Sequence, residues 1–396
     1  MAPTTPHSLS SGPGVVGVEG RYPLHERPAP ALRIAGREVL PVGPLRMYTC
    51  GITPYDVTHA GHAATFVWAD LIASLAHATG SEAVVARNVT DVDDVLTEAA
   101  RTRGWHYDEL ALTREFLFDR DMKTLSVAPP ALAPHARAHI PAVVRLASAL
   151  ITRGGAYEVD GHVMFRGAGV PARAGLDDDA ALAASREYGD QDGLPERESQ
   201  FDVPVWRPSP AEHPAWPSPW GWGRPGWHAE CAAMAVCSLG SSVDVLLGGS
   251  DLTFPHHAYQ VAMVEAATGV HPFATAVVHV GEVRRDGAKM AKSTGNLVLV
   301  TELLDRHTPS AVRFGLLHRR WPDPWDCDDS VFLEAAAELA ELQDLAGGSA
   351  AASVRHDGVL GALTEDLDVP RAVAVARDAG PAAVGYLLDV LKVRHR

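Results

Sequence analysis

Two short segments of the sequence carry side chains that could hold the phosphates of a nucleotide. His59 and His62 flank Gly61 where a predicted strand turns into a predicted helix, so both imidazoles can face a phosphate held by the helix's free backbone N–H groups. Lys289 and Lys292 lie close together in a later loop, where two cations could stabilise charge that builds up on a transferring phosphate. Taken singly, two histidines near a helix start are more often ordinary caps, and two such lysines more often belong to a solvated loop.

A third set of residues has the chemistry of a metal site. Cys50 ends a predicted strand, Cys231 lies in the segment GWHAEC, and His256 lies near the start of a predicted helix, all at the expected carboxyl edge of one sheet. Zinc prefers thiolate and imidazole ligands, and three protein ligands leave one coordination position open for a substrate. A buried cysteine can instead act as a small hydrophobic residue, and we assign that structural role to Cys237 and Cys327.

The composition indicates a globular chain with an acidic balance of charge. The 396 residues are 46% hydrophobic, which is enough for a sizeable core shared by two or three domains. The net charge of -15 has the wrong sign for wrapping a polyanion, so a nucleic-acid partner is not expected. The sequence shows no leader-like segment, no long apolar run and only four cysteines. We therefore expect a cytoplasmic protein with reduced thiols and no membrane insertion.

The hydrophobic pattern predicts an α/β fold. Residues 41–51 indicate a strand, 59–80 an amphipathic helix closed by Gly80, and 82–94 a second buried strand. This order opens a doubly wound parallel sheet, in which ligands bind at the carboxyl ends of the strands. The sheet is expected to resume at residues 241–251 and 274–280.

Three regions follow from this pattern. We predict a flexible arm over residues 1–40, which leads into a short strand pair, and a Rossmann-like catalytic domain over 41–300 with an inserted connective domain at about 106–190. The remaining residues, 301–396, are predicted to form a C-terminal helical domain.

Four segments together resemble one family. The chain contains, in this order, CGITPYDVTHAGHA, GRPGWHAEC, GGSDLTFPHH and KMAKSTGN, as in the cysteinyl-tRNA synthetase superfamily of class I aminoacyl-tRNA synthetases. The resemblance implies the class I fold and activation of an amino acid by ATP. It also implies that Cys50, Cys231 and His256 hold Zn2+, whose open position takes the thiolate of substrate cysteine. A serine hydroxyl is a poor ligand for zinc, which accounts for selectivity.

The resemblance also implies roles for more residues. His59, His62, Lys289 and Lys292 would stabilise the reacting phosphate, with Mg2+ on the departing diphosphate. Trp227 would wall the cysteine pocket, and Val283 would contact adenine through its backbone. The residues further expected to hold the adenylate, its ribose or the acceptor are Cys50, Gly51, Ile52, Thr53, Thr65, Asn88, Val89, Thr90, Gly249, Ser250 and Asp251. Asp251 could orient an acceptor amine.

Within the superfamily, the closer resemblance is to the cysteine:glucosaminyl-inositol ligases of mycothiol biosynthesis, whose cysteine strand also reads CGITPYD. Both families make cysteinyl-AMP, but these ligases pass cysteine to the amine of glucosaminyl-inositol (GlcN-Ins), whereas the synthetases pass it to tRNA. The CGITPYD strand favours the ligases, as does Gln260 at the position of the synthetases' fourth zinc-site residue, a glutamate. The segment after KMAKS also leaves too few residues for an anticodon-reading domain. The expected substrates are therefore ATP, L-cysteine and GlcN-Ins.

Several departures from the family motifs widen the range of possible functions. Residues 289–293, KMAKS, form the family's signature loop, in which Ala291 replaces the usual serine. Ala258 replaces a glutamate, and residues 187–192 differ from the ligases' ERGGDP. These changes leave room for a paralogue that joins cysteine to a different amine. The sequence is also compatible with a truncated cysteinyl-tRNA synthetase, and with a catalytically inactive sensor of cysteine or zinc.

Overall fold

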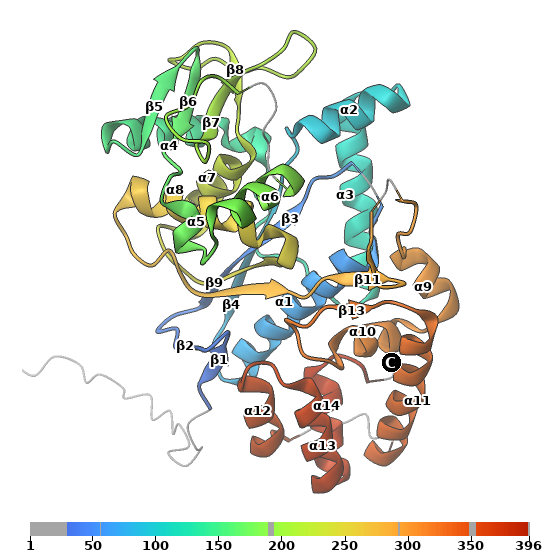
Figure 1. Ribbon diagram of the computed structural model, residues 1–396. Helices are drawn as coiled ribbons and strands as arrows, with labels where there is room; N and C mark the ends of the chain where they lie inside the picture. The colour runs from blue at the N-terminus through green and yellow to red at the C-terminus, as the bar shows by residue number, and fades with distance from the viewer. Residues whose placement is uncertain (1–29, 56, 189–193, 292–293, 348–353, 395–396) are drawn as a thin grey trace, which may run out of the picture.

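A computed structural model describes residues 30–55, 57–188, 194–291, 294–347 and 354–394 of the chain. Its centre is a parallel sheet with the strand order β10-β9-β3-β4. The strands are β3 (Leu45–Ile52), β4 (Ala83–Val89), β9 (Val243–Gly249) and β10 (Ala274–Val280). In Figure 1 this sheet lies between the inserted segment above and the C-terminal helices below. The α/β fold predicted from the sequence is confirmed.

The central strands are apolar because helices cover both faces of the sheet. Leu45 and Met47 of β3 and Val245 of β9 are fully buried. Helix α1 (Ala60–Ala78) connects β3 to β4, begins after His59 and ends at Thr79, close to the predicted limits. Gly80 follows with φ +87, a backbone conformation that glycine adopts without steric cost.

The residues between β4 and β9 form a second layer around an antiparallel sheet with the order β5-β6-β7-β8. The sheet consists of β5 (Ala156–Val159), β6 (His162–Phe165), β7 (Val203–Pro208) and β8 (Gly223–Pro225). The helices of this segment are α2 (Asp94–Arg103), α3 (Tyr107–Thr124), α4 (Ile140–Thr152), α5 (Val170–Arg173), α6 (Asp178–Tyr188) and α7 (Trp227–Leu239). The inserted domain was predicted to end at about residue 190, whereas this sheet extends to Pro225. The short strands β7 and β8 are rich in proline and glycine and show no clear alternation, so no sequence pattern marked them.

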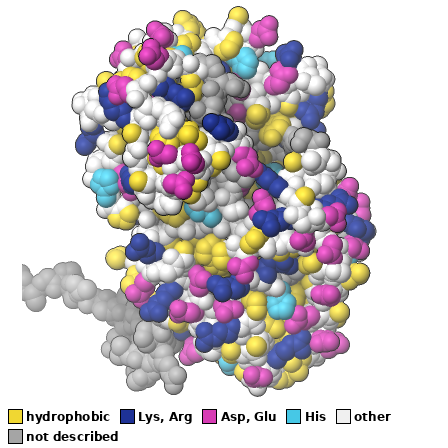
Figure 2. Space-filling model, viewed as in Figure 1, with side chains coloured by type: hydrophobic (Ala, Val, Ile, Leu, Met, Phe, Trp, Pro, Cys, Tyr) yellow, Lys and Arg dark blue, Asp and Glu magenta, His cyan; other side chains and the backbone are white. Residues whose placement is uncertain are grey.

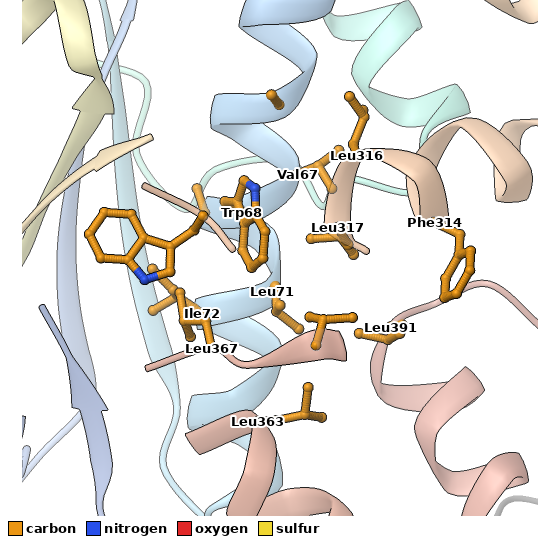
Figure 3. Packing of buried hydrophobic residues seen from close by; sticks show 14 of the residues in the cluster. Val67, Trp68, Leu71, Ile72, Phe314, Leu316, Leu317, Leu363, Leu367 and Leu391 are labelled. Carbon is orange, nitrogen blue, oxygen red and sulfur yellow. The ribbon is translucent and has the colours of Figure 1, made fainter. Parts of the chain in front are cut away.

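The C-terminal region is helical and packs against α1. It contains α9 (Val300–Arg306), α10 (Pro309–Leu317), α11 (Asp329–Ala346), α12 (Asp357–Thr364), α13 (Val369–Ala379) and α14 (Pro381–Val390), with the short strand β13 (Trp325–Asp326) between α10 and α11. Figure 3 shows Trp68 and Leu71 of α1 facing Leu317 of α10 and Leu363 of α12. The hairpin of β1 (Leu32–Ile34) and β2 (Arg37–Val39) lies within residues 1–40, where a flexible arm leading into a strand pair was predicted. Residues 1–29 of that predicted arm lie outside the described residues.

A buried ion pair fastens this region to α1. The Arg313 guanidinium lies 2.6 Å from an Asp70 carboxylate oxygen, and the Lys392 ammonium lies 2.8 Å from the second oxygen of that carboxylate. Arg313 also donates to the backbone carbonyl oxygens of Leu125 and Leu391. These cations hold the pKa of Asp70 below its usual value against the opposing effect of burial.

None of the described helices is both long and apolar enough to cross a membrane.

Candidate nucleotide and metal site

A pocket of the described residues lies at the carboxyl end of the parallel sheet, between strands β3 and β9. From β3 the chain proceeds to β4 on one side, whereas β9 and β10 lie on the opposite side, so the carboxyl ends of β3 and β9 form a topological switch point. Open α/β sheets bind ligands at this position because the connections diverge there. The pocket is lined by the end of β3, the start of α1, the segments after β9 and β10, and the signature loop.

The two predicted histidines lie together at the start of α1. The Nδ1 atom of His59 accepts a hydrogen bond from the backbone N–H of Gly61 at 3.2 Å, and the His59 and His62 rings stack with centroids 3.9 Å apart. A Cβ at Gly61 would lie 3.0 Å from the His59 ring, which explains the glycine. Thus His59 is both a helix cap and a pocket residue.

Both histidines are neutral. Burial lowers the pKa of His59 to about 4, and burial together with His59 lowers the pKa of His62 well below its usual value. The Nδ1 atom of His62 is buried and has no hydrogen-bond partner among the described residues. These imidazoles can therefore act on a phosphate as uncharged hydrogen-bond donors rather than as cations.

The signature loop follows the hairpin of β11 (Val283–Arg285) and β12 (Ala288–Lys289). Strand β13 of the C-terminal region pairs in parallel with β11, so the C-terminal region holds the hairpin that precedes the loop. The Lys289 ammonium lies at the pocket and donates to a carboxylate oxygen of Glu187 in α6 at 2.9 Å. Lys292, the second predicted lysine, lies outside the described residues.

Asn296 shapes the described part of this loop. Its Oδ1 accepts from the backbone N–H of Ala291 and from the Thr294 hydroxyl, both at 2.8 Å, and its Nδ2 donates to the Lys289 carbonyl at 3.1 Å. The sequence analysis did not assign Asn296 any role. Because its side-chain amide joins both ends of the turn, it fixes the backbone that carries Lys289.

Cys50, Cys231 and His256 come together as predicted. Their potential ligand atoms all lie within 4.8 Å of one another, and all three side chains are buried. They come from three elements: β3, α7 and the π-helical turn Thr253–His257 before α8 (Ala258–Thr268). Burial, followed by the neighbouring Cys50, raises the pKa of the Cys231 thiol well above its usual value. Two sulfurs and an imidazole in this arrangement suit a soft or borderline divalent cation.

The predicted pocket residues divide into two groups. The pocket wall includes the following predicted residues: Cys50, Gly51, Ile52, Thr53, Thr65, Trp227, Gly249, Ser250, Asp251 and Val283. The indole of Trp227 also packs on the His256 ring, with centroids 4.1 Å apart. The wall therefore joins the potential metal group to the nucleotide side of the pocket.

The wall does not include Asn88, Val89 or Thr90, which are all buried behind it. Strand β4 is the edge of the sheet, one strand away from the switch point, and the segment around Leu132 and His135 bridges to it. The Thr90 hydroxyl lies 2.7 Å from that of Thr53, so Thr90 supports a wall residue instead of forming the wall.

Several wall residues were not assigned by the sequence analysis, Phe118, Tyr55 and Glu282 among them. Phe118 comes from α3, which sequence patterns placed in the insertion, and Tyr55 and Glu282 flank predicted residues. Glu282 directly precedes Val283 and could have been found by extending that segment. Nothing in the sequence around Phe118 distinguishes it from an ordinary helix core residue.

Comparisons with known proteins agree with this architecture. The family model described as tRNA synthetases class I (C) catalytic domain matches residues 38–337, so the chain belongs to this family. A solved structure of Mycobacterium tuberculosis methionyl-tRNA synthetase with methionyl-adenylate is similar, with a TM-score of 0.62 and 16% identity, covering 88% of this chain and 89% of that one. That likeness concerns the fold alone.

Curated relatives are more similar in sequence. The L-cysteine:1D-myo-inositol 2-amino-2-deoxy-alpha-D-glucopyranoside ligase of Kribbella flavida is 42% identical, covering 84% of each chain. The protein of the same name from Mycolicibacterium vanbaalenii is 40% identical, covering 96% of this chain and 90% of the relative. A cysteine--tRNA ligase of Xanthomonas euvesicatoria is 38% identical, covering 90% of this chain and 78% of the relative.

Proposed function

We propose that the chain activates L-cysteine with ATP and joins it to the amine of GlcN-Ins, giving Cys-GlcN-Ins, AMP and diphosphate. The observation that carries this proposal is the buried group of Cys50, Cys231 and His256, of which Cys50 lines the pocket that also contains His59, His62 and Lys289. The relatives named for this reaction support the choice of acceptor. ATP-dependent ligation is the chemistry that the whole family shares.

The first step forms the adenylate. The substrate carboxylate attacks the α-phosphorus of ATP, an oxygen–phosphorus bond forms, and diphosphate leaves with the electron pair of the broken bond. His59 and His62 donate hydrogen bonds to the reacting phosphate, and Lys289 offsets its developing negative charge. We assign the same role to Lys292, and Mg2+ would accompany the diphosphate.

The cysteine side chain is selected at the metal group. Cys50, Cys231 and His256 would hold Zn2+, which when bound supplies a Lewis acid that favours a thiol over a hydroxyl. Trp227 packs beside His256 and forms part of the pocket wall. We infer that a cysteine whose sulfur lies at this group directs its carboxylate toward the two histidines.

The second step transfers the cysteinyl group. The neutral amine attacks the carbonyl carbon of cysteinyl-AMP, a carbon–nitrogen bond forms, and AMP leaves with the electrons of the broken carbon–oxygen bond. The attacking nitrogen also loses a proton, which passes to solvent. We propose Asp251, at the pocket wall, as the group that orients the amine, and Gly249 and Ser250 as contacts to ribose or to the acceptor sugar.

Two observations favour a small amine over tRNA. The chain carries a net charge of -15, and on the face shown in Figure 2 the described Lys and Arg side chains are interspersed with Asp and Glu. A tRNA surface needs a continuous basic region. Gln260 also lies beside Cys50, where a synthetase-like site would carry glutamate.

A panel of acceptors tests the proposal. Purified protein is incubated with ATP, cysteine and either GlcN-Ins, glucosamine or a tRNA transcript, and AMP release is measured. GlcN-Ins should accelerate AMP release more than glucosamine does. Acceleration by tRNA alone would contradict the acceptor and favour the second candidate, a cysteinyl-tRNA synthetase, which the Xanthomonas euvesicatoria relative keeps in view.

The same panel separates an inactive sensor from an enzyme. Cysteine-dependent exchange of labelled diphosphate into ATP reports the first step without any acceptor, so its absence from metal-loaded protein would contradict catalysis. We place the reaction in the cytoplasm, in keeping with four free thiols.

A further inference from the structure

Each of the three potential metal ligands has a polar hydrogen-bond partner, and these three partners come from different elements. Asn88 of β4 contacts Cys231, His228 of α7 contacts His256, and Gln260 of α8 contacts Cys50. All three partners are buried, with exposed fractions of 2%, 3% and 0% in that order. Partners of this kind orient metal ligands and often matter nearly as much as the ligands themselves.

The orientation of Asn88 is fixed by the opposite end of its amide. Its Oδ1 accepts from the backbone N–H of Gly51 at 2.9 Å, so Nδ2 must be the atom that lies 3.4 Å from the Cys231 sulfur. The amide therefore donates to that sulfur. Asn88 lies behind the pocket wall, and this contact gives it a role at the metal group.

His228 assigns the coordinating nitrogen of His256. The Nδ1 atoms of the two rings lie 3.0 Å apart. An imidazole that coordinates a metal uses one nitrogen and donates its N–H from the second, so the Nδ1 contact leaves Nε2 for the metal. His228 itself is held by stacking on Tyr259, with ring centroids 5.4 Å apart.

Gln260 differs from Asn88 because only one of the two polar atoms of its amide makes a hydrogen bond. The Cys50 thiol donates to its Oε1 at 3.5 Å, whereas its Nε2 is fully buried with no hydrogen-bond partner among the described residues. An unpaired buried amide N–H costs about 1 to 3 kcal/mol. In this arrangement the Nε2 donor of Gln260 therefore has no acceptor among the described residues.

A metal-bound cysteine sulfur can only accept hydrogen bonds. A half-turn of the Gln260 amide exchanges Oε1 and Nε2 at nearly the same positions, so the unpaired donor would then face the Cys50 sulfur. A carboxylate at this position could not donate and would add negative charge beside two thiolates. The amide thus suits both the metal-free and the metal-bound ligand.

We propose that Gln260 is a positioning residue of the metal site that changes from acceptor to donor toward Cys50 when the metal binds. With Asn88 and His228 it completes a set of neutral partners, one for each ligand. This inference rests on the metal group of the proposed function, but not on the identity of the acceptor.

The test uses Gln260→Leu, which keeps the side-chain size and removes both hydrogen-bonding atoms. The affinities for zinc and cobalt(II) are measured by chelator competition on the otherwise unmodified full chain, without ATP, cysteine or amino sugar. We expect affinity to fall by about 10-fold to 100-fold, with a shift in the sulfur-to-cobalt absorption band. Because the metal-free chain loses only a poorly satisfied polar group, its unfolding free energy should stay the same or rise.

Gln343→Leu is the matched control. Gln343 lies in α11 and donates to the carbonyl oxygen of Val393, far from the metal group, so its loss should leave metal affinity unchanged. Gln260→Met provides a second apolar variant with a more adaptable side chain. The inference is overturned if either folded Gln260 variant binds metal as tightly as the unmodified chain, or if both variants fail to fold without metal, since Gln260 would then be structural. The acceptor panel can fail independently of this result.

Discussion

Replacing Asn296 by alanine should weaken catalysis without touching any atom of the nucleotide. The side chain makes three hydrogen bonds inside the signature loop, with the Ala291 N–H, the Thr294 hydroxyl and the Lys289 carbonyl. Alanine removes all of them and leaves Lys289 chemically intact. The expected effect is therefore on how often the loop presents the Lys289 ammonium to the phosphates.

The magnitude follows from the number and exposure of these bonds. Each hydrogen bond contributes about 1 kcal/mol net, and because the loop is half-exposed we take about 2 kcal/mol for the set. That value corresponds to about a 30-fold change in the equilibrium between the ordered and open loop. Thr294→Val removes only the hydroxyl contacts with Ala291 and Asn296, so we expect about a fivefold effect.

Cysteine-dependent exchange of labelled diphosphate into ATP measures the first step directly. The value of kcat/KM for ATP should fall by about 30-fold in Asn296→Ala and less in Thr294→Val. Unfolding by denaturant should be unchanged, because the loop contributes little to the core. Equal activity of Asn296→Ala and unmodified protein, or a larger loss in Thr294→Val, would refute this account of the loop.

Three further outcomes follow from the structure. Arg313→Met leaves Asp70 buried with only Lys392 as its cation, so the unfolding free energy should fall by about 3 to 5 kcal/mol in denaturant titrations, whereas an exposed pair would change little. His59 and His228 have pKa values lowered by burial to about 4 and about 3, so the folded chain keeps them neutral and the unfolded chain protonates them below about pH 6.5. Stability should therefore fall by about 2 kcal/mol for each histidine between pH 7 and 5, and His59→Asn, which keeps a capping acceptor, should fall less steeply. Finally, chelator dialysis should abolish cysteine-dependent exchange and added zinc should restore it; full activity of metal-free protein would contradict the assigned role of Cys50, Cys231 and His256.

An exposed ion pair links the inserted segment to the signature loop. Lys289 and Glu187 have exposed side-chain fractions of 40% and 54%, so their pairing is weak and can yield to the phosphates of ATP. Glu187 begins the segment whose sequence departs from the related ligases.

The sequence by itself determined the central fold and the signature segments. Apolar runs and a glycine stop located β3, α1 and β4 within a few residues, because hydrophobic periodicity and turn residues act locally. The adjacency of His59 and His62 at the start of α1 likewise needs only the spacing of neighbouring residues. For the same reason the antiparallel strands β7 and β8, which lack a local pattern, were not placed.

Only the tertiary structure decided which distant residues share the site. Cys50 and Cys231 are separated by most of the inserted segment, and no local sequence pattern indicates that β3 and α7 meet. The family resemblance suggested this contact, and the tertiary fold brings the two residues together. Asn88 was expected at the adenylate wall, but it lies behind that wall and contacts Cys231, because β4 is the edge strand of the sheet. Side-chain direction depends on which strands become neighbours, and that choice is made by burial across the whole chain.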